Sequence, residues 1–150
     1  MWTQEEATFE GTYYQVRGAI NQPKGVQKPH IPLLIGGEGE KVTLRLVAQY
    51  ADACNLSGFM GKEERQRKLS VLREHCQTLG RAYEQIEKTL TLEVYITRDG
   101  RNGTLSPQAA IGLFRELAAE GFEHVIVAMP NMTDAEPFDV LGSRIIRAIQ

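Results

Sequence analysis

The hydrophobic pattern of residues 31–150 switches repeatedly between the spacing of strands and the spacing of helices. Four short apolar runs predict strands, at about Pro32–Ile35, Asp52–Leu56, Thr89–Thr97 and His124–Met129. Between and after them, apolar residues three or four apart predict helices, at about Glu40–Tyr50, Lys62–Leu79, Pro107–Glu120 and a last one carrying Phe138, Leu141, Ile145 and Ile149. A crossover helix between successive strands requires those strands to be parallel. The pattern therefore predicts an α/β fold of four βα units.

Two architectures satisfy this order: an open doubly wound sheet, or part of a (β/α) barrel. The third predicted strand bears on the choice, because its apolar residues alternate with three threonines, Glu93 and Tyr95. Strands of an open parallel sheet are usually apolar on both faces, whereas a barrel interior accepts a polar one. This favours the barrel, with an edge strand of an open sheet as the alternative.

Residues 1–30 do not share the alternation. The segment Thr8–Val16 is aromatic and β-branched around Gly11, which indicates a short hairpin or an extended loop. Pro23, Gly25 and Pro29 keep the following chain irregular. We expect two parts, a lead-in over residues 1–30 and four βα units over residues 31–150.

Composition excludes several classes of protein. The 150 residues carry a formal net charge of −2 with both signs scattered, which argues against nucleic-acid or anionic-membrane partners. The apolar runs are too short to span a bilayer, and the acidic start resembles no signal peptide. Cys54 and Cys76 show no disulfide or metal-ligand spacing, so we expect buried free thiols and a cytoplasmic location.

A glycine-rich turn follows the first predicted strand and precedes its helix, at Gly36, Gly37, Glu38 and Gly39. Glycines let backbone N–H groups converge on an anion, and the helix that follows directs its positive dipole end to the same place. The turn is therefore a candidate phosphate site, with plain turn geometry as the alternative. Asn55, at the end of the second strand, would lie at the same rim, unless it only caps a turn.

Other candidates for chemistry are weak. His30, His75 and His124 share no metal-ligand spacing and are expected on loops or surfaces. Met129 and Pro130 follow the fourth strand and are expected to pack, while Asn131 has the same alternatives as Asn55. Glu93 is the one carboxylate that a barrel interior would enclose. We predict no catalytic residue and no metal site in this chain.

Several segments also resemble one known family. They are Gln27–Lys41, Thr43–Ala48 and Tyr50–Asn55, supported by Met1–Trp2, Phe9–Tyr14 and Val127–Asn131. Together they resemble the bacterial-luciferase-like monooxygenases, most of all the branch of coenzyme F-420-dependent oxidoreductases. The resemblance implies a (β/α)8 barrel of roughly twice this length, of which this chain would be the C-terminal half.

The same resemblance implies a cofactor, either FMN or coenzyme F-420, at the mouth of the barrel. Its phosphate would lie on the turn Gly36–Gly37–Glu38–Gly39, with Asn55 nearby, and hydride would pass between the cofactor and a small organic substrate. The first four strands of relatives supply much of the ring-binding surface, so we expect this chain to be inactive alone. The expected partner is an N-terminal half barrel or a second copy of the chain. The rival interpretations are a non-catalytic half-barrel module and an open flavodoxin-like sheet.

Overall fold

The computed structural model describes residues 1–149, and the chain divides into the units Met1–Leu33 and Leu34–Gln150. In the first unit, β1 (Glu6–Glu10) and β2 (Gln15–Ile20) form an antiparallel hairpin with an irregularity between Ala7 and Phe9. Aromatic side chains at its tip, Tyr13 and Tyr14, are exposed. A two-stranded hairpin buries little apolar surface by itself.

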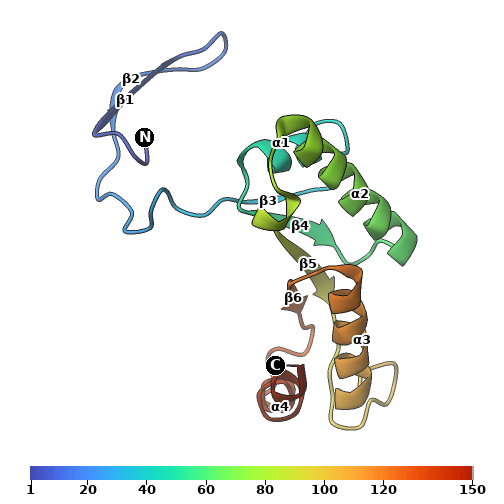
Figure 1. Cartoon of the computed structure of the whole chain (residues 1–150). Helices are drawn as coiled ribbons and strands as arrows, with labels where there is room; N and C mark the ends of the chain where they lie inside the picture. Colours follow the sequence, from blue (N-terminus) through green and yellow to red (C-terminus); the bar gives the residue numbers. More distant parts are fainter. Residues whose placement is uncertain (150) are drawn as a thin grey trace. The chain divides into compact units, whose positions relative to one another are not determined.

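The second unit is built on a four-stranded sheet, shown in Figure 1 with the strands following one another along the colour bar. The strands are β3 (Leu34–Gly36), β4 (Ala53–Ser57), β5 (Glu87–Glu93) and β6 (His124–Ala128). Every neighbouring pair is parallel, in the order β3-β4-β5-β6. The predicted parallel α/β arrangement is confirmed.

Helices connect and follow these strands. They are α1 (Thr43–Tyr50), α2 (Lys62–Leu79), the 3-10 turn η1 (Tyr83–Gln85), α3 (Pro107–Glu120), and a C-terminal run of α4 (Glu136–Val140), the π-helical turn η2 (Leu141–Ile145) and α5 (Ile146–Ile149). Because the strand order follows the chain without reversal, right-handed crossovers place all the connecting helices on one face of the sheet. A flavodoxin-like sheet needs a reversal of strand order, and the described strands contain none, so that interpretation is wrong.

The apolar core lies between the sheet and this helix layer. From the sheet it includes Cys54, Leu56 and Leu90, and from the helices Leu44, Val47, Leu72 and Phe114. The helix ends follow the sequence signals. Ser106 Oγ accepts a hydrogen bond from the Ala109 N–H at the start of α3, and Gly80 and Gly121 end α2 and α3 in the left-handed conformation.

Two predicted boundaries are wrong. The third strand ends at Glu93 and not near Thr97, because beyond Val94 the chain leaves β6 and Ile96 forms a bridge with Leu105. The first helix begins at Thr43 and not at Glu40. The residues between form a wide turn that is closed by a hydrogen bond from the Leu44 N–H to the Gly39 carbonyl (2.9 Å).

The long helix α2 is tied to its neighbours by charge as well as by packing. Arg65 makes two hydrogen bonds of 2.8 Å to the Glu120 carboxylate of α3, which raises the pKa of Arg65. The Arg65–Glu120 pair is largely buried, whereas Arg67 and Glu64 form an exposed pair along the helix. Helix α2 therefore combines a buried ion pair to α3 with an exposed pair along its own length. No helix in residues 1–149 is long and apolar enough to cross a bilayer.

Candidate functional site

The carboxyl ends of parallel strands share one edge of the sheet, and this edge gathers the candidate residues. Gly36 ends β3, and its register partner on β4 is Asn55, which in turn faces Thr89 on β5. The Gly37 N–H donates to the Asn55 carbonyl at 3.2 Å. The turn and Asn55, far apart in the sequence, are therefore direct neighbours.

Glycine is required in the turn by both conformation and space. Gly37 has a φ of +131°, a region that side chains other than glycine rarely adopt. A Cβ at Gly37 would lie 3.1 Å from Thr43 Cγ2, and one at Gly39 would lie 2.9 Å from Thr43 Oγ1. Thr43, the first residue of α1, thus packs into the space that the two glycines leave.

The backbone N–H groups of the turn are only partly used inside the protein. That of Gly37 is bonded to Asn55. Within residues 1–149, the N–H groups of Glu38, Gly39 and Glu40 have no hydrogen-bond acceptor. These three donors lie in the turn just before α1, where the helix dipole adds a partial positive charge. The turn therefore leaves three backbone donors for an anion such as a phosphate.

The side chain of Glu38 works against an anion. Its Oε1 accepts a hydrogen bond of 3.2 Å from the Ser57 N–H at the end of β4, which brings a carboxylate to the same edge. Because like charges repel, Glu38 suits a phosphate through its backbone N–H and not through its side chain.

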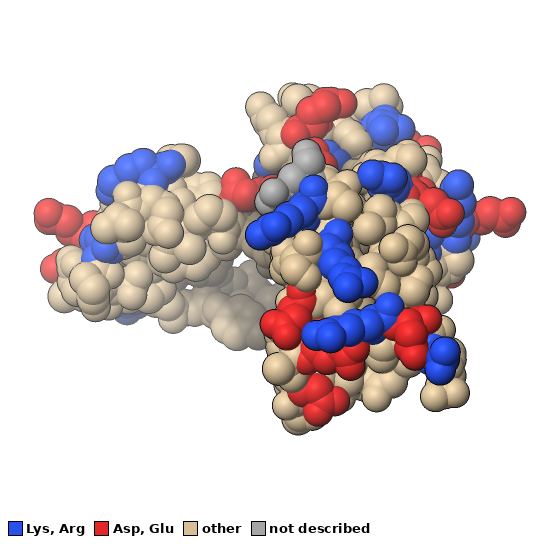
Figure 2. Space-filling model, turned by 90° about the horizontal axis from the view of Figure 1, so that it is seen from below, with Lys and Arg blue, Asp and Glu red and all other residues tan. Residues whose placement is uncertain are grey.

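Nearby basic side chains are already engaged. Glu40 accepts a hydrogen bond of 2.9 Å from Lys68 Nζ and lies 3.2 Å from Arg67, while His75 Nε2 contacts the Glu40 carbonyl at 2.7 Å. The Lys68 hydrogen bond, with the charges of Arg67 and Lys68, lowers the pKa of Glu40. On the face seen in Figure 2, which views the molecule from below Figure 1, acidic and basic side chains also lie close together. The backbone, and not a cluster of cations, would attract an anion here.

Asn55 is held in one orientation. Its Oδ1 accepts hydrogen bonds from Thr89 Oγ1 (2.8 Å) and Thr91 Oγ1 (3.1 Å), so it does not cap a turn. Sequence reasoning missed the role of the two threonines. Their alternation along β5 was the available signal, since both lie on the face that carries Asn55.

The residues after β6 have structural roles. Met129 is buried in the core, as expected, and Pro130 is exposed. Asn131 is buried, and its Nδ2 donates to the Ile96 carbonyl at 2.9 Å, which ties this loop to the chain beyond β5. Asn131 Oδ1 has no partner among the described residues. Asn131 therefore holds the loop.

The histidines lie away from the turn or serve its structure. His124 begins β6, at the opposite edge, 3.3 Å from Glu87. Within the described residues, no three His, Cys, Asp or Glu side chains are grouped as metal ligands.

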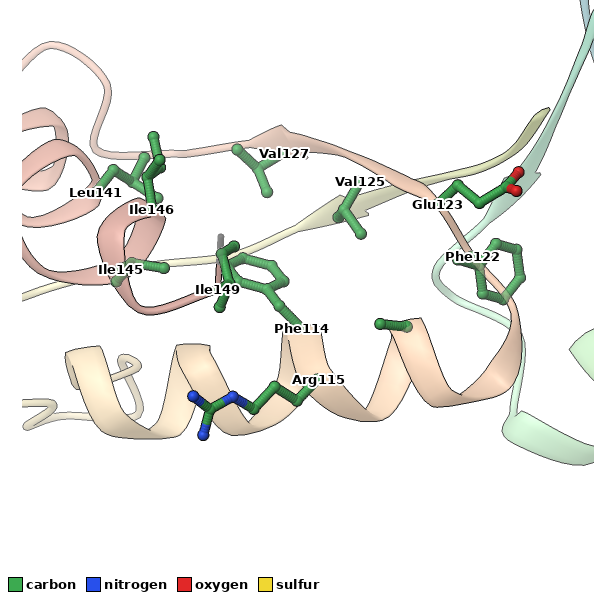
Figure 3. Close-up of a pocket in the computed structure, with 11 residues that line it drawn as sticks. Phe114, Arg115, Phe122, Glu123, Val125, Val127, Leu141, Ile145, Ile146 and Ile149 are labelled. Atoms are coloured by element: carbon green, nitrogen blue, oxygen red, sulfur yellow. The ribbon is translucent and has the colours of Figure 1, made fainter.

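An apolar cavity of about 350 Å³ lies on the helix side of the sheet. Figure 3 shows Val125 and Val127 of β6 facing Phe114 of α3 and Ile145, Ile146 and Ile149 of the C-terminal run. The cavity lies between β6 and these helices, and none of the described residues that line it belongs to the glycine turn.

Comparison with known proteins identifies the family. The model of the luciferase-like monooxygenases matches residues 1–102. The chain belongs to the luciferase-like monooxygenase family. It is also 28% identical over 147 residues to an F-420-dependent glucose-6-phosphate dehydrogenase of Nakamurella multipartita. That match covers 96% of this chain and 42% of the relative, so the chain spans less than half the relative's length.

Solved structures of luciferase-like enzymes share the fold. An F-420-dependent secondary alcohol dehydrogenase, in complex with an F-420–acetone adduct, superposes with a TM-score of 0.81 at 14% identity, over 99% of this chain and 58% of that one. Riboflavin lyase, solved with modified FMN and riboflavin, superposes with a TM-score of 0.76 at 10% identity, over 95% of this chain and 47% of that one. At these identities the likeness shows a luciferase-like α/β fold.

Proposed function

We propose that the chain is the C-terminal half of a (β/α)8 barrel that acts as an F-420- or FMN-dependent oxidoreductase. The observation that carries the proposal is the sheet itself. Four parallel strands in chain order present one edge with a glycine turn, whose Glu38, Gly39 and Glu40 N–H groups lack acceptors in residues 1–149. The relatives named above, which use F-420 or contain FMN, support either cofactor.

In this proposal the turn binds the cofactor phosphate through the N–H groups of Glu38, Gly39 and Glu40. Asn55, beside Gly36, adds a side-chain donor on the inner face of the sheet. The cofactor supplies hydride transfer to or from a small organic substrate. This chain's residues anchor and orient it, and none of them is assigned an acid–base role.

The proposal includes a partner that completes the barrel, either an N-terminal half barrel or a second copy of this chain. Both β3 and β6 are edge strands with unpaired backbone groups, which closed barrels do not have. The face turned away from the helices exposes Leu34 and Ile126. Activity would depend on that partner, because one side of a mouth cannot hold both cofactor and substrate. Two free, buried thiols agree with a cytoplasmic location.

A second candidate function is a non-catalytic half-barrel module for binding or assembly. Two observations favour it: the Gly37 N–H is consumed by Asn55, and the Glu38 carboxylate lies at the same edge. Both reduce the capacity of the turn to hold an anion.

Titration of F-420 and of FMN, read by their fluorescence, separates the two functions. The chain is measured alone and together with an N-terminal half barrel taken from a family member. We expect tight binding only when both halves are present. Equal and tight binding by this chain alone would refute the need for a partner, and no binding in either case would favour the non-catalytic module.

A further inference from the structure

Neighbouring hydroxyl groups determine which way the side-chain amide of Asn55 points. Thr89 and Thr91 both direct a hydroxyl at Asn55 Oδ1, at 2.8 and 3.1 Å. Thr89 is only 1% exposed, so its hydroxyl is shielded from bulk water. A hydroxyl that donates needs an acceptor, and only the oxygen end of the amide can serve. The NH₂ end must therefore point away from β5.

On the side of Asn55 opposite β5 lies Gly36 of β3. An ideal Cβ at Gly36 would lie 4.0 Å from Asn55 Nδ2, so the absence of a side chain there leaves the approach to the NH₂ group open. The described residues provide no acceptor for Nδ2. Gly36 begins the turn in which the acceptor-free N–H groups lie.

We propose that Thr89 and Thr91 are positioning residues that fix Asn55 as a hydrogen-bond donor, so that its NH₂ group binds an oxygen of the ligand beside Gly36. The inference rests on the proposed function, which supplies the ligand. The oxygen belongs either to the phosphate or to a carbonyl of the cofactor ring. With the two threonines in place, Asn55 discriminates against any ligand that presents a donor at this point.

The first experiment uses the full chain together with the added N-terminal half barrel, because the proposed function expects tight binding only then. It follows two ¹⁵N NMR signals of this chain, the Gly39 amide and the Asn55 side-chain NH₂. The probes are inorganic phosphate, which has no ring, and riboflavin, which has no phosphate. Shifts at Asn55 with phosphate identify a phosphate oxygen, and shifts with riboflavin identify a ring carbonyl. Either result supports the inference.

The second experiment tests the threonines on the probe that binds. The double variant Thr89→Val and Thr91→Val keeps the shape and removes both hydroxyls. We expect its affinity to fall about tenfold, the effect of losing one hydrogen bond to a charged group. The matched variant with Thr89→Ser and Thr91→Ser keeps the hydroxyls and should bind like the original chain.

A mutant cycle separates positioning from general damage. If the threonines act through Asn55, the valine pair should cause no further loss of affinity in a chain that already carries Asn55→Ala. Gly36→Ala gives an independent check, because a methyl group fits at 4.0 Å without strain but covers the NH₂ group. It should weaken binding and leave the melting temperature unchanged.

The outcomes distinguish this inference from the function on which it rests. If Gly39 shifts with phosphate while Asn55 does not, and the valine pair binds normally, the inference is wrong and the phosphate site stands. Additive losses in the mutant cycle would also overturn it. If neither probe shifts Gly39 or Asn55, the proposed site and the inference both fail.

Discussion

The two faces of the four-stranded sheet differ in how completely the chain satisfies them. On the helix side, Leu56 of β4 is 1% exposed and lies within one continuous apolar core. On the other face, Leu34 of β3 is 53% exposed, and polar groups line the neighbouring strands. The covered face explains why the unit folds, and the open face is where the proposed ligand and partner would bind.

The two faces also differ in their hydrogen bonds. The open face carries a polar row formed by Asn55, Thr89 and Thr91. Within this row the two hydroxyls donate to Asn55 Oδ1, and the Asn55 NH₂ group has no acceptor among residues 1–149. On the helix side, the Arg65 guanidinium of α2 pairs with the Glu120 carboxylate of α3.

The largest difference is expected from a matched pair of leucines. Leu56→Ala should lower the free energy of unfolding by about 3 kcal/mol, because it empties space in a packed core. Leu34→Ala, on the open face, should cost less than about 1 kcal/mol. Urea unfolding of the two variants measures both values. The measurement uses a protein concentration at which the chain is monomeric, and similar losses there would contradict the division between the two faces.

The buried ion pair of the helix layer should also matter. The side chains of Arg65 and Glu120 are 12% and 5% exposed, so Glu120→Gln leaves a cation without its partner and should cost about 3 kcal/mol. Glu64→Gln breaks the exposed pair with Arg67 and should cost below about 0.5 kcal/mol. Thermal unfolding compares them. An equal cost would mean that solvent reaches Glu120.

A third pair compares two glycines. Gly37→Ala places a side chain at a φ of +131° and against Thr43, and it should cost about 2 kcal/mol. Gly112→Ala, within α3 where a Cβ meets no atom within 4 Å, should stabilise the chain by about 0.5–1 kcal/mol. The same urea titration reports both. A neutral Gly37→Ala would show that the turn relaxes freely.

The smallest effect concerns pH. The hydrogen bond from Lys68 lowers the pKa of Glu40 in the folded chain from 4.5, so its stabilisation is present above about pH 4.5. It is lost as the pH falls through the lowered value. Glu40→Gln should therefore flatten the loss of stability in acid, whereas Glu63→Gln, an exposed residue of α2, should not. Identical acid profiles for Glu40→Gln and the original chain would contradict this.

Sequence reasoning found the elements because each one carries a local signal. Helix α3 spans Pro107–Glu120 as expected, between the capping residues Ser106 and Gly121, and the four apolar runs became strands. The strand ends were less predictable, since the departure of β5 at Glu93 depends on a bridge between Ile96 and Leu105 that only the folded chain creates.

The candidate site was predictable in its backbone and not in its side chains. Gly36 and Asn55 were placed at one edge because parallel strands share it, and the structure brings them together. The orientation of Asn55 depends on Thr89 and Thr91, which lie 34 and 36 residues away in the chain. The Glu38 side chain likewise meets Ser57 only through folding.

Light scattering of the chain alone tests most directly whether the open face is the inside of an incomplete barrel. Two free strand edges and an exposed Leu34 and Ile126 predict association, so the measured mass should exceed the 16.8 kDa of one chain. It should return to one copy of each half when an N-terminal half barrel is added. A stable monomer of 16.8 kDa, insensitive to salt and to the added half, would contradict the account.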